Sequence, residues 1–213
     1  MCKIATTIRN LIFTFIITSA SLVNANLIVN GSFETPVVPV GNFTNFGTGS
    51  SDITGWTVVG TEVSIASTTF MSNGVTFQAQ DEMQWADLTG GISNSPSNGL
   101  RQLVATVPGQ EYLLEFYVGS ATGAPFFFPA TVDLMIDGGA RSSYFNPTGP
   151  SNMLDWKHFS VSFTAASAMT QLTFYNGSAP NNFLAGLDNV SLTSVPEPNC
   201  LTGFLIGLVW LFQ

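Results

Sequence analysis

The sequence predicts an all-β fold: an antiparallel β-sandwich of the jelly-roll type with about ten strands. Between residues 26 and 194, short runs of alternating apolar and polar residues recur about every eight to fifteen residues. Each run is bounded by Gly, Pro, Asn or Ser, which is the pattern of strands joined by turns. Helical periodicity is nearly absent, and no internal repeat indicates a propeller or a solenoid.

Two runs show the alternation most clearly. In residues 112–118 (YLLEFYV) the even-numbered positions are apolar and face the core, whereas Glu115 lies on the other face. Residues 157–163 follow the same rule, with Phe159 inward and His158 outward. The other predicted strands are 57–59, 62–65, 75–79, 84–88, 100–107, 131–136, 171–175 and 186–192.

The 213 residues divide into a leading segment, one domain and a tail. Residues 1–25 are predicted to be a secretory signal peptide, because Lys3 and Arg9 precede an apolar stretch and Val23-Asn24-Ala25 forms a small-residue cleavage site. The alternative is an uncleaved membrane anchor, but the apolar run at residues 11–17 is shorter than the ~20 residues of a spanning helix. The domain comprises residues 26–194 and the tail residues 195–213.

Composition excludes several classes of partner and site. The chain carries a net charge of -8, and residues 26–194 contain only Arg101, Arg141 and Lys157 as cations, so nucleic acid is not a predicted partner. Cys2 and Cys200 both lie outside the domain, which excludes a disulfide framework and a thiolate zinc site within it. A content of 45% hydrophobic residues, with 18 Phe, indicates a folded chain and not a disordered one.

The tail begins with Val195-Pro196-Glu197-Pro198, and an apolar run follows from 201 to 212. This arrangement resembles the PEP-CTERM sorting signal of bacteria that export proteins along with extracellular polysaccharide. In that family an Arg-rich cluster ends the tail and an exosortase-type enzyme removes it, whereas this chain ends at Gln213 without a basic cluster. The resemblance implies export to the cell surface, the outer membrane or the extracellular space. It also implies an exosortase-type partner and membrane contact only through the terminal segments. The alternative is that the tail packs on the domain as a last strand or helix.

Three motifs resemble galactose-binding-like jelly rolls, which include carbohydrate-binding modules and plant cell-wall proteins with related domains. They are residues 26–34 (NLIVNGSFE), residues 53–56 (ITGW) and residues 186–192 (GLDNVSL). In those families the first motif forms a strand beside the last one, the Trp, here Trp56, belongs to the core, and the Glu and late Asp often bind a structural calcium.

The resemblance therefore implies that Glu34 and Asp188 hold calcium, an ion that takes several oxygen ligands. The alternative is that both carboxylates cap turns and accept backbone N–H groups. No other cofactor is predicted.

Candidate ligand-binding residues are aromatic side chains near polar ones. Trp85 follows Asp81 and Glu82, and Phe126, Phe127 and Phe128 lie between two prolines. Sugar rings present apolar faces that stack on aromatic side chains, so an exposed aromatic beside a carboxylate would form a saccharide platform. The alternative is that these side chains fill the core or the underside of a loop.

The chain is not predicted to be an enzyme. His158 is its only histidine, it lies on the outward face of its strand, and no nucleophile motif accompanies it. Carboxylates for glycoside hydrolysis exist, but no pair of them can be identified from the sequence. The favoured hypothesis is a cell-surface module that binds a polysaccharide or glycan. The alternative is a structural matrix or adhesion protein without a small ligand. Exposure of Trp85 or of residues 126–128 distinguishes the two.

Overall fold

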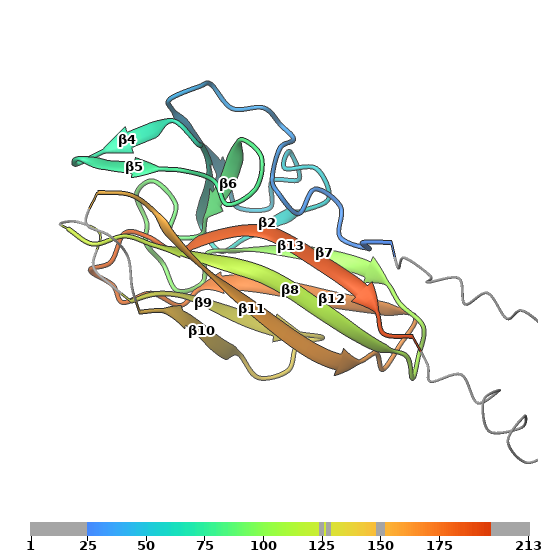
Figure 1. The fold of residues 1–213 in the computed structure, drawn as a ribbon. Helices are drawn as coiled ribbons and strands as arrows, with labels where there is room; N and C mark the ends of the chain where they lie inside the picture. The colour runs from blue at the N-terminus through green and yellow to red at the C-terminus, as the bar shows by residue number, and fades with distance from the viewer. Residues whose placement is uncertain (1–24, 124–125, 127–128, 148–151, 197–213) are drawn as a thin grey trace, which may run out of the picture.

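The computed structural model describes residues 25–123, 126, 129–147 and 152–196. They form thirteen strands in two large antiparallel sheets and one small hairpin. The large sheets pack face to face as a β-sandwich, and the hairpin lies at one end, away from the two ends of the chain (Figure 1). None of the described residues belongs to a helix that could span a membrane. Most of the predicted signal peptide, both cysteines and the tail from residue 197 lie outside the described residues.

The first sheet has six strands in the order β1-β3-β6-β13-β8-β11. Their bounds are β1 Phe43–Gly47, β3 Glu62–Ser67, β6 Gln84–Asp87, β13 Gly186–Ser194, β8 Glu111–Ser120 and β11 Asp155–Thr164. The second sheet has five strands in the order β10-β9-β12-β7-β2. Their bounds are β10 Ser142–Asn146, β9 Ala130–Ile136, β12 Met169–Asn176, β7 Gly99–Ala105 and β2 Thr57–Val59. The hairpin joins β4 (Phe70–Ser72) and β5 (Val75–Phe77).

The predicted all-β antiparallel sandwich is confirmed, and all ten predicted strands are present. The expected alternation along β8 is also confirmed: its even-numbered residues from 112 to 118 are buried in the core, and its odd-numbered ones face outward. Phe159 of β11 packs against the same core, whereas His158 is exposed. Trp56, predicted to be a core residue, is buried and donates its indole N–H to the Asn30 carbonyl oxygen at 2.9 Å.

The prediction of about ten strands was too low, because β1, β4 and β10 were missed. β4 is only three residues long, too short for an alternating pattern to appear. β1 and β10 are edge strands, and only one residue of each is buried. An edge strand with one buried residue carries too weak a hydrophobic period to be distinguished from a loop.

Residues 26–34, the first of the three motifs, lie beside β13 as expected, but they do not form a strand. Leu27 donates its N–H to the Leu192 carbonyl oxygen, and the Gly31 carbonyl oxygen accepts the N–H of Val190. The chain turns with positive φ at Asn30, between these bonds, and again at Phe33, after them. A left-handed residue breaks the pleat of a strand, so the segment follows β13 through isolated bonds and forms no regular ladder.

Candidate functional site

A second apolar cluster lies on the outer face of the six-stranded sheet, opposite the sandwich core. Along β3, Val63 and Ile65 enter the main core, whereas Ala66 belongs to the second cluster. Along β6, Ala86 enters the main core and Trp85 the second cluster. Because successive side chains of a strand point to opposite faces, both faces of this part of the sheet are covered.

The cover over the outer face includes the β4–β5 hairpin and Phe126. Their aromatic rings form a continuous series: Phe70 lies 5.2 Å from Phe43 and 5.4 Å from Phe77, measured between ring centroids. Phe77 in turn lies 5.8 Å from Trp85 and 5.0 Å from Phe126. Offset and edge-on contacts of this kind stabilise the packing beyond the apolar area that they bury.

One row of residues crosses all six strands on this outer face. In order from β1 to β11, the paired positions are Asn45, Ser64, Asp87, Gly186, Gly119 and Trp156. The two glycines are needed by the packing. A Cβ atom on Gly119 would lie 2.8 Å from the Trp156 ring, and one on Gly186 would lie 2.9 Å from the Gly119 backbone. The Trp156 ring therefore packs on the backbone of a glycine. It contacts the Trp85 ring edge-on, with 5.9 Å between the ring centroids.

A cavity of about 230 Å³ lies between the sheet and its cover. Six of the lining residues are aromatic, and the others are polar residues, alanine and glycine. The lining residues are Phe43, Ser64, Ala66, Phe70, Ser72, Asn73, Phe77, Trp85, Asp87, Gly90, Gly91, Phe126 and Phe183. A concave, mostly apolar site with a few polar groups is the usual form of a small-molecule site.

Two polar groups of the cavity lining have unused hydrogen-bonding capacity. The indole Nε1–H of Trp85 is buried and has no acceptor. The Asp87 side chain accepts bonds at Oδ1 from the N–H of Thr89 (3.0 Å), the Thr89 hydroxyl (2.8 Å) and the N–H of Ala185 (3.1 Å). Its Oδ2 receives no hydrogen bond from the described residues. Leaving a buried donor without a partner costs about 1–3 kcal/mol. Because the Nε1 atom of Trp85 exposes almost no surface, the group that a ligand in the cavity can reach is Oδ2 of Asp87.

Burial raises the pKa of Asp87 to about 6, and the nearby carboxylate of Glu62 acts in the same direction. The bonds from Thr89 and Ala185 act in the opposite direction, because they favour the charged form. Glu62 itself is held by the N–H groups of Ile92 (2.7 Å) and Ser93 (2.8 Å). Asp87 is therefore ionised at neutral pH, and the cavity then contains one carboxylate.

The structure brings together two of the predicted ligand-binding residues, Trp85 and Phe126, although they are far apart in the sequence. Both line the cavity, but both are buried: Trp85 is 1% exposed and Phe126 8%. The expected exposed platform is therefore wrong for these two residues, because the β4–β5 hairpin and the neighbouring loops cover them. Phe127 and Phe128 lie outside the described residues.

Glu34 and Asp188, the predicted calcium ligands, both hold the segment 80–84. Glu34 Oε1 accepts the N–H of Met83 at 2.8 Å and of Gln84 at 2.7 Å. Asp188 Oδ2 accepts the N–H of Gln80 at 2.8 Å and of Asp81 at 3.1 Å. These bonds are the alternative to calcium that the sequence leaves open, in which the carboxylates accept backbone amides.

The surroundings of Asp188 do not fit a calcium ion. Its side chain is fully buried, and its Oδ1 accepts the N–H of Asn189 at 2.7 Å. Calcium takes six to eight oxygen ligands, whereas three N–H donors converge on this carboxylate. Burial raises the pKa of Asp188 to about 8, with a smaller contribution from Asp81, while these N–H donors act in the opposite direction. Among the described residues, no group of three or more His, Cys, Asp or Glu side chains is arranged to hold a metal.

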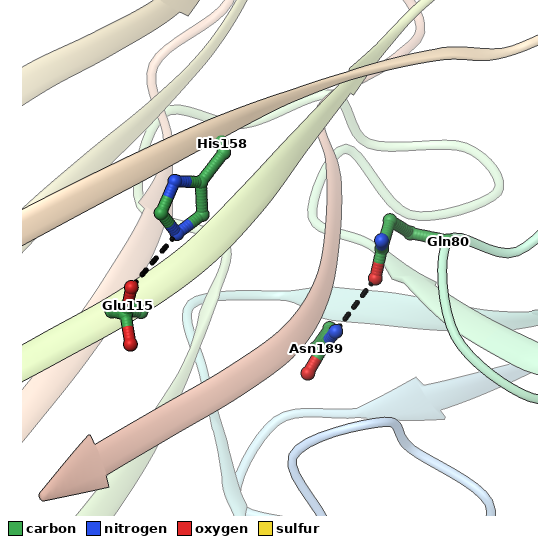
Figure 2. A network of polar contacts seen from close by, with 4 residues as sticks. All are labelled: Gln80, Glu115, His158 and Asn189. Atoms are coloured by element: carbon green, nitrogen blue, oxygen red, sulfur yellow. Dashed lines mark hydrogen bonds and ion pairs between the residues drawn. The ribbon is translucent and has the colours of Figure 1, made fainter.

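The single histidine lies away from the cavity, on the open part of the same outer face. His158 Nε2 is 3.1 Å from Glu115 Oε1, and its ring lies 4.9 Å from that of Tyr117. Figure 2 shows this pair on β11 and β8, with a second polar contact nearby, in which Asn189 Nδ2 donates to Gln80 Oε1 at 2.7 Å. His158 thus has a carboxylate partner but no nucleophile among its contacts.

Comparison with known proteins identifies one family and several solved structures to which this chain is similar. A family described as "Protein of unknown function (DUF642)" matches residues 26–192. No match was found among curated proteins.

Similar solved structures include one described as "CBM4 structure and function", at 17% identity and a TM-score of 0.41, covering 79% of this chain and 99% of that one. The CBM22-1 xylan-binding domain of Paenibacillus barcinonensis Xyn10C has 14% identity and a TM-score of 0.43, with 76% and 99% covered. An exo-beta-1,3-galactanase from Phanerochaete chrysosporium has 17% identity and a TM-score of 0.41, with 73% of this chain and 29% of that one covered.

Sequence reasoning missed several residues of the cavity. Phe43, Phe70 and Phe77 build its aromatic side, yet they come from three short strands. One signal was available for Asp87. On β6, Trp85 and Asp87 share one face while Ala86 and Leu88 are apolar on the other, so a large aromatic and a carboxylate are paired on the face away from the core.

Proposed function

Since this chain belongs to the family described as "Protein of unknown function (DUF642)", whose description assigns no activity, we propose from the site itself that it is a non-catalytic module that binds carbohydrate. The ligand occupies the cavity on the outer face of the six-stranded sheet. The observation that carries this proposal is the pairing of aromatic lining residues with a free acceptor, Oδ2 of Asp87.

A sugar ring fits both sides of such a cavity. Its C–H faces are apolar and pack against aromatic side chains, while its hydroxyl groups donate and accept hydrogen bonds. Oδ2 of Asp87 accepts from a hydroxyl, and a hydrogen bond to a charged group contributes about 1.5–3 kcal/mol.

A binding role without catalysis is supported by the acids around the cavity. Asp87 is the single carboxylate among the described residues that line it. Glycoside hydrolysis requires two carboxyl groups on either side of the scissile bond. Glu62 lies close enough to affect the Asp87 pKa, but its Oε1 is bonded to two backbone N–H groups and it does not line the cavity.

The proposed site of action is the outside of the cell. The signal-like residues 1–25 and the PEP-CTERM-like tail support export to the cell surface, the outer membrane or the extracellular space, with an exosortase-type enzyme acting on the tail. The ligand there is an exopolysaccharide or a cell-surface glycan. A low charged-residue content of 8% suits a protein that works among polar, uncharged polymers.

Affinity electrophoresis through gels that contain neutral glucans, galactans, mannans or xylans tests the proposal. We expect one of these polymers to retard the wild-type protein, and Phe43→Ala to weaken binding about five- to tenfold, because it removes one ring of the aromatic wall. Phe145→Ala is the matched control, since Phe145 is also a half-exposed phenylalanine on an edge strand but lies on β10 of the other sheet. Equal retardation of both variants would contradict the site, and no retardation by any polymer would contradict the function.

A second candidate is a structural matrix or adhesion protein without a small ligand. It is favoured by the exposure of Val37 (85%) and Val40 (79%), two valines of the same loop. Exposed apolar side chains that lie close together mark surfaces for association with other molecules. Sedimentation of the wild type and of the double variant Val37→Ser/Val40→Ser tests this candidate. The wild type should self-associate as its concentration rises, and the double variant should not.

A further inference from the structure

The cavity is lined by the six-stranded sheet and by its aromatic cover. Its floor is formed by Ala66 and Trp85 on neighbouring strands. Phe43 of β1 lines it, and the hairpin contributes Phe70 and Phe77. The ring centroids of Phe43 and Phe70 lie 5.2 Å apart and those of Phe70 and Phe77 5.4 Å apart, so these side chains form a continuous aromatic wall.

Other segments complete the lining. Phe126 continues the aromatic wall through its contact with Phe77, 5.0 Å away. The turn at Gly90 and Gly91 follows β6 and lines the cavity together with Asp87, and Phe183 lines it from the segment before β13.

The volume of the cavity sets the size of the group that enters. At about 230 Å³ it is smaller than the roughly 300–1,000 Å³ of sites that take drug-sized ligands. The cavity therefore has room for one sugar ring with its hydroxyl groups, but not for several linked rings.

The charge of the cavity sets the kind of ring. Asp87 is the charged lining residue, its Oδ2 is free, and Glu62 adds a second negative charge close by. No Lys or Arg lines the cavity among the described residues, and the whole chain carries a net charge of -8. A carboxylate on the ligand would be repelled by Asp87 in a partly buried site where screening by salt is weak.

From these observations, and resting on the carbohydrate-binding function proposed above, we infer that the cavity takes a single uncharged sugar ring, with Asp87 as the residue that excludes sugar acids.

Competition experiments test both parts of this inference on the whole protein at pH 7.5, where Asp87 is ionised. The probe is whichever neutral polysaccharide retards the protein. The competitors are glucose, galactose, mannose and xylose, with glucuronate (for glucose and xylose), galacturonate and mannuronate as their acid counterparts. We expect one of the neutral monosaccharides to compete. The uronate of the same sugar should compete about tenfold more weakly.

The variant Asp87→Asn removes the negative charge and should bring the uronate to within about twofold of the neutral sugar. Asp137→Asn is its matched control, an exposed aspartate in the turn after β9 that accepts the N–H of Gln171, and it should keep the tenfold difference.

Three other outcomes would overturn the inference. Competition that rises with oligosaccharide length and is absent for every monosaccharide would mean that the cavity takes several linked rings and not one. Equal competition by the uronate and the neutral sugar in the wild type would mean that Asp87 excludes nothing. In both cases the carbohydrate-binding function stands, because polymer still binds. If no polymer binds and Phe43→Ala behaves as the wild type, the proposed function itself fails together with the inference.

Discussion

Glu34 and Asp188 hold the two halves of one short segment, residues 80–84, with their carboxylates. Glu34 accepts the N–H groups of Met83 and Gln84, and Asp188 those of Gln80 and Asp81. This segment leads directly into β6, which carries Trp85 and Asp87. The two carboxylates therefore fix the start of the strand on which the cavity depends, although neither of them lines the cavity.

Removal of divalent ions tests whether these carboxylates also hold calcium, which remains a proposal from the resemblance. Because five backbone N–H groups already bond to the two carboxylates, we expect EDTA to leave the Tm unchanged. Excess calcium should likewise have no effect. A fall in the Tm with EDTA that calcium but not magnesium reverses would instead establish the calcium site.

Stability should decrease as the pH rises, because of Asp188. Burial raises its pKa to about 8 in the folded protein, against about 3.9 in an unfolded chain. The folded state therefore binds this proton more tightly, and the stabilisation is largest at low pH and is lost as the pH rises through about 8. Asp87, with its pKa raised to about 6, acts in the same direction over a lower range.

We expect the Tm at pH 8.5 to lie below that at pH 5 by at least about 2–4 °C, the shift that corresponds to roughly 1 kcal/mol in a chain of this size. The variant Asp188→Asn should reduce this slope, whereas the exposed control Asp137→Asn should keep it. A Tm that rises from pH 5 to pH 8.5 would contradict the burial of a protonated Asp188.

The sandwich can be predicted from the sequence because its strands bury one face each. β8 and β11 carry a regular period of two, and this period identifies both the strand and its inward side. The outer cover is different. β6 is buried on both faces, so Trp85 appears as an aromatic beside polar residues whether it is exposed or covered. Whether Trp85 is covered depends on Phe70 and Phe77 of the hairpin, which come close to Trp85 only through tertiary contacts.

The candidate site was therefore predictable only in part. Trp85 and Phe126 can be selected as aromatics in polar or proline-bounded surroundings, and they do line one cavity. Asp87 could have been added from its place on the same face of β6 as Trp85. Phe43 could not be assigned to the cavity, because its place there depends on the pairing of β1 with β3 and of β3 with β6. Strand order within an antiparallel sheet is set by long-range contacts, which a single sequence does not display.

Gly119→Ala tests the glycine floor under Trp156. The added Cβ would lie 2.8 Å from the tryptophan ring, so the ring must move and its edge-on contact with Trp85 must change. We expect a destabilisation of about 1–3 kcal/mol, typical of overpacking, and an altered near-ultraviolet circular dichroism spectrum. Gly47→Ala is the matched control on β1, because its Cβ would meet no atom within 4 Å. If both variants unfold at the same urea concentration, the close packing over Gly119 is wrong.

Sugar recognition should depend on pH through Asp87. Burial raises the pKa of this side chain to about 6, so below that pH it is mostly protonated and above it mostly ionised. A protonated carboxyl neither repels a uronate nor accepts a charge-assisted hydrogen bond at Oδ2. As the pH falls from 7.5 to 5, we therefore expect the affinity for the neutral sugar to fall and the roughly tenfold preference over its uronate to shrink towards about twofold.

The uronate stays ionised over this range, because free sugar carboxyls titrate near the ordinary range of carboxylic acids. A change in the charge of the uronate therefore does not cause the expected change in preference. Isothermal titration calorimetry at pH 5, 6 and 7.5 measures both affinities. The variant Asp87→Asn supplies the reference, since it should bind with the same preference at all three pH values. A preference that remains tenfold at pH 5 in the wild type, or one that changes equally in Asp87→Asn, would show that another group discriminates between the two ligands.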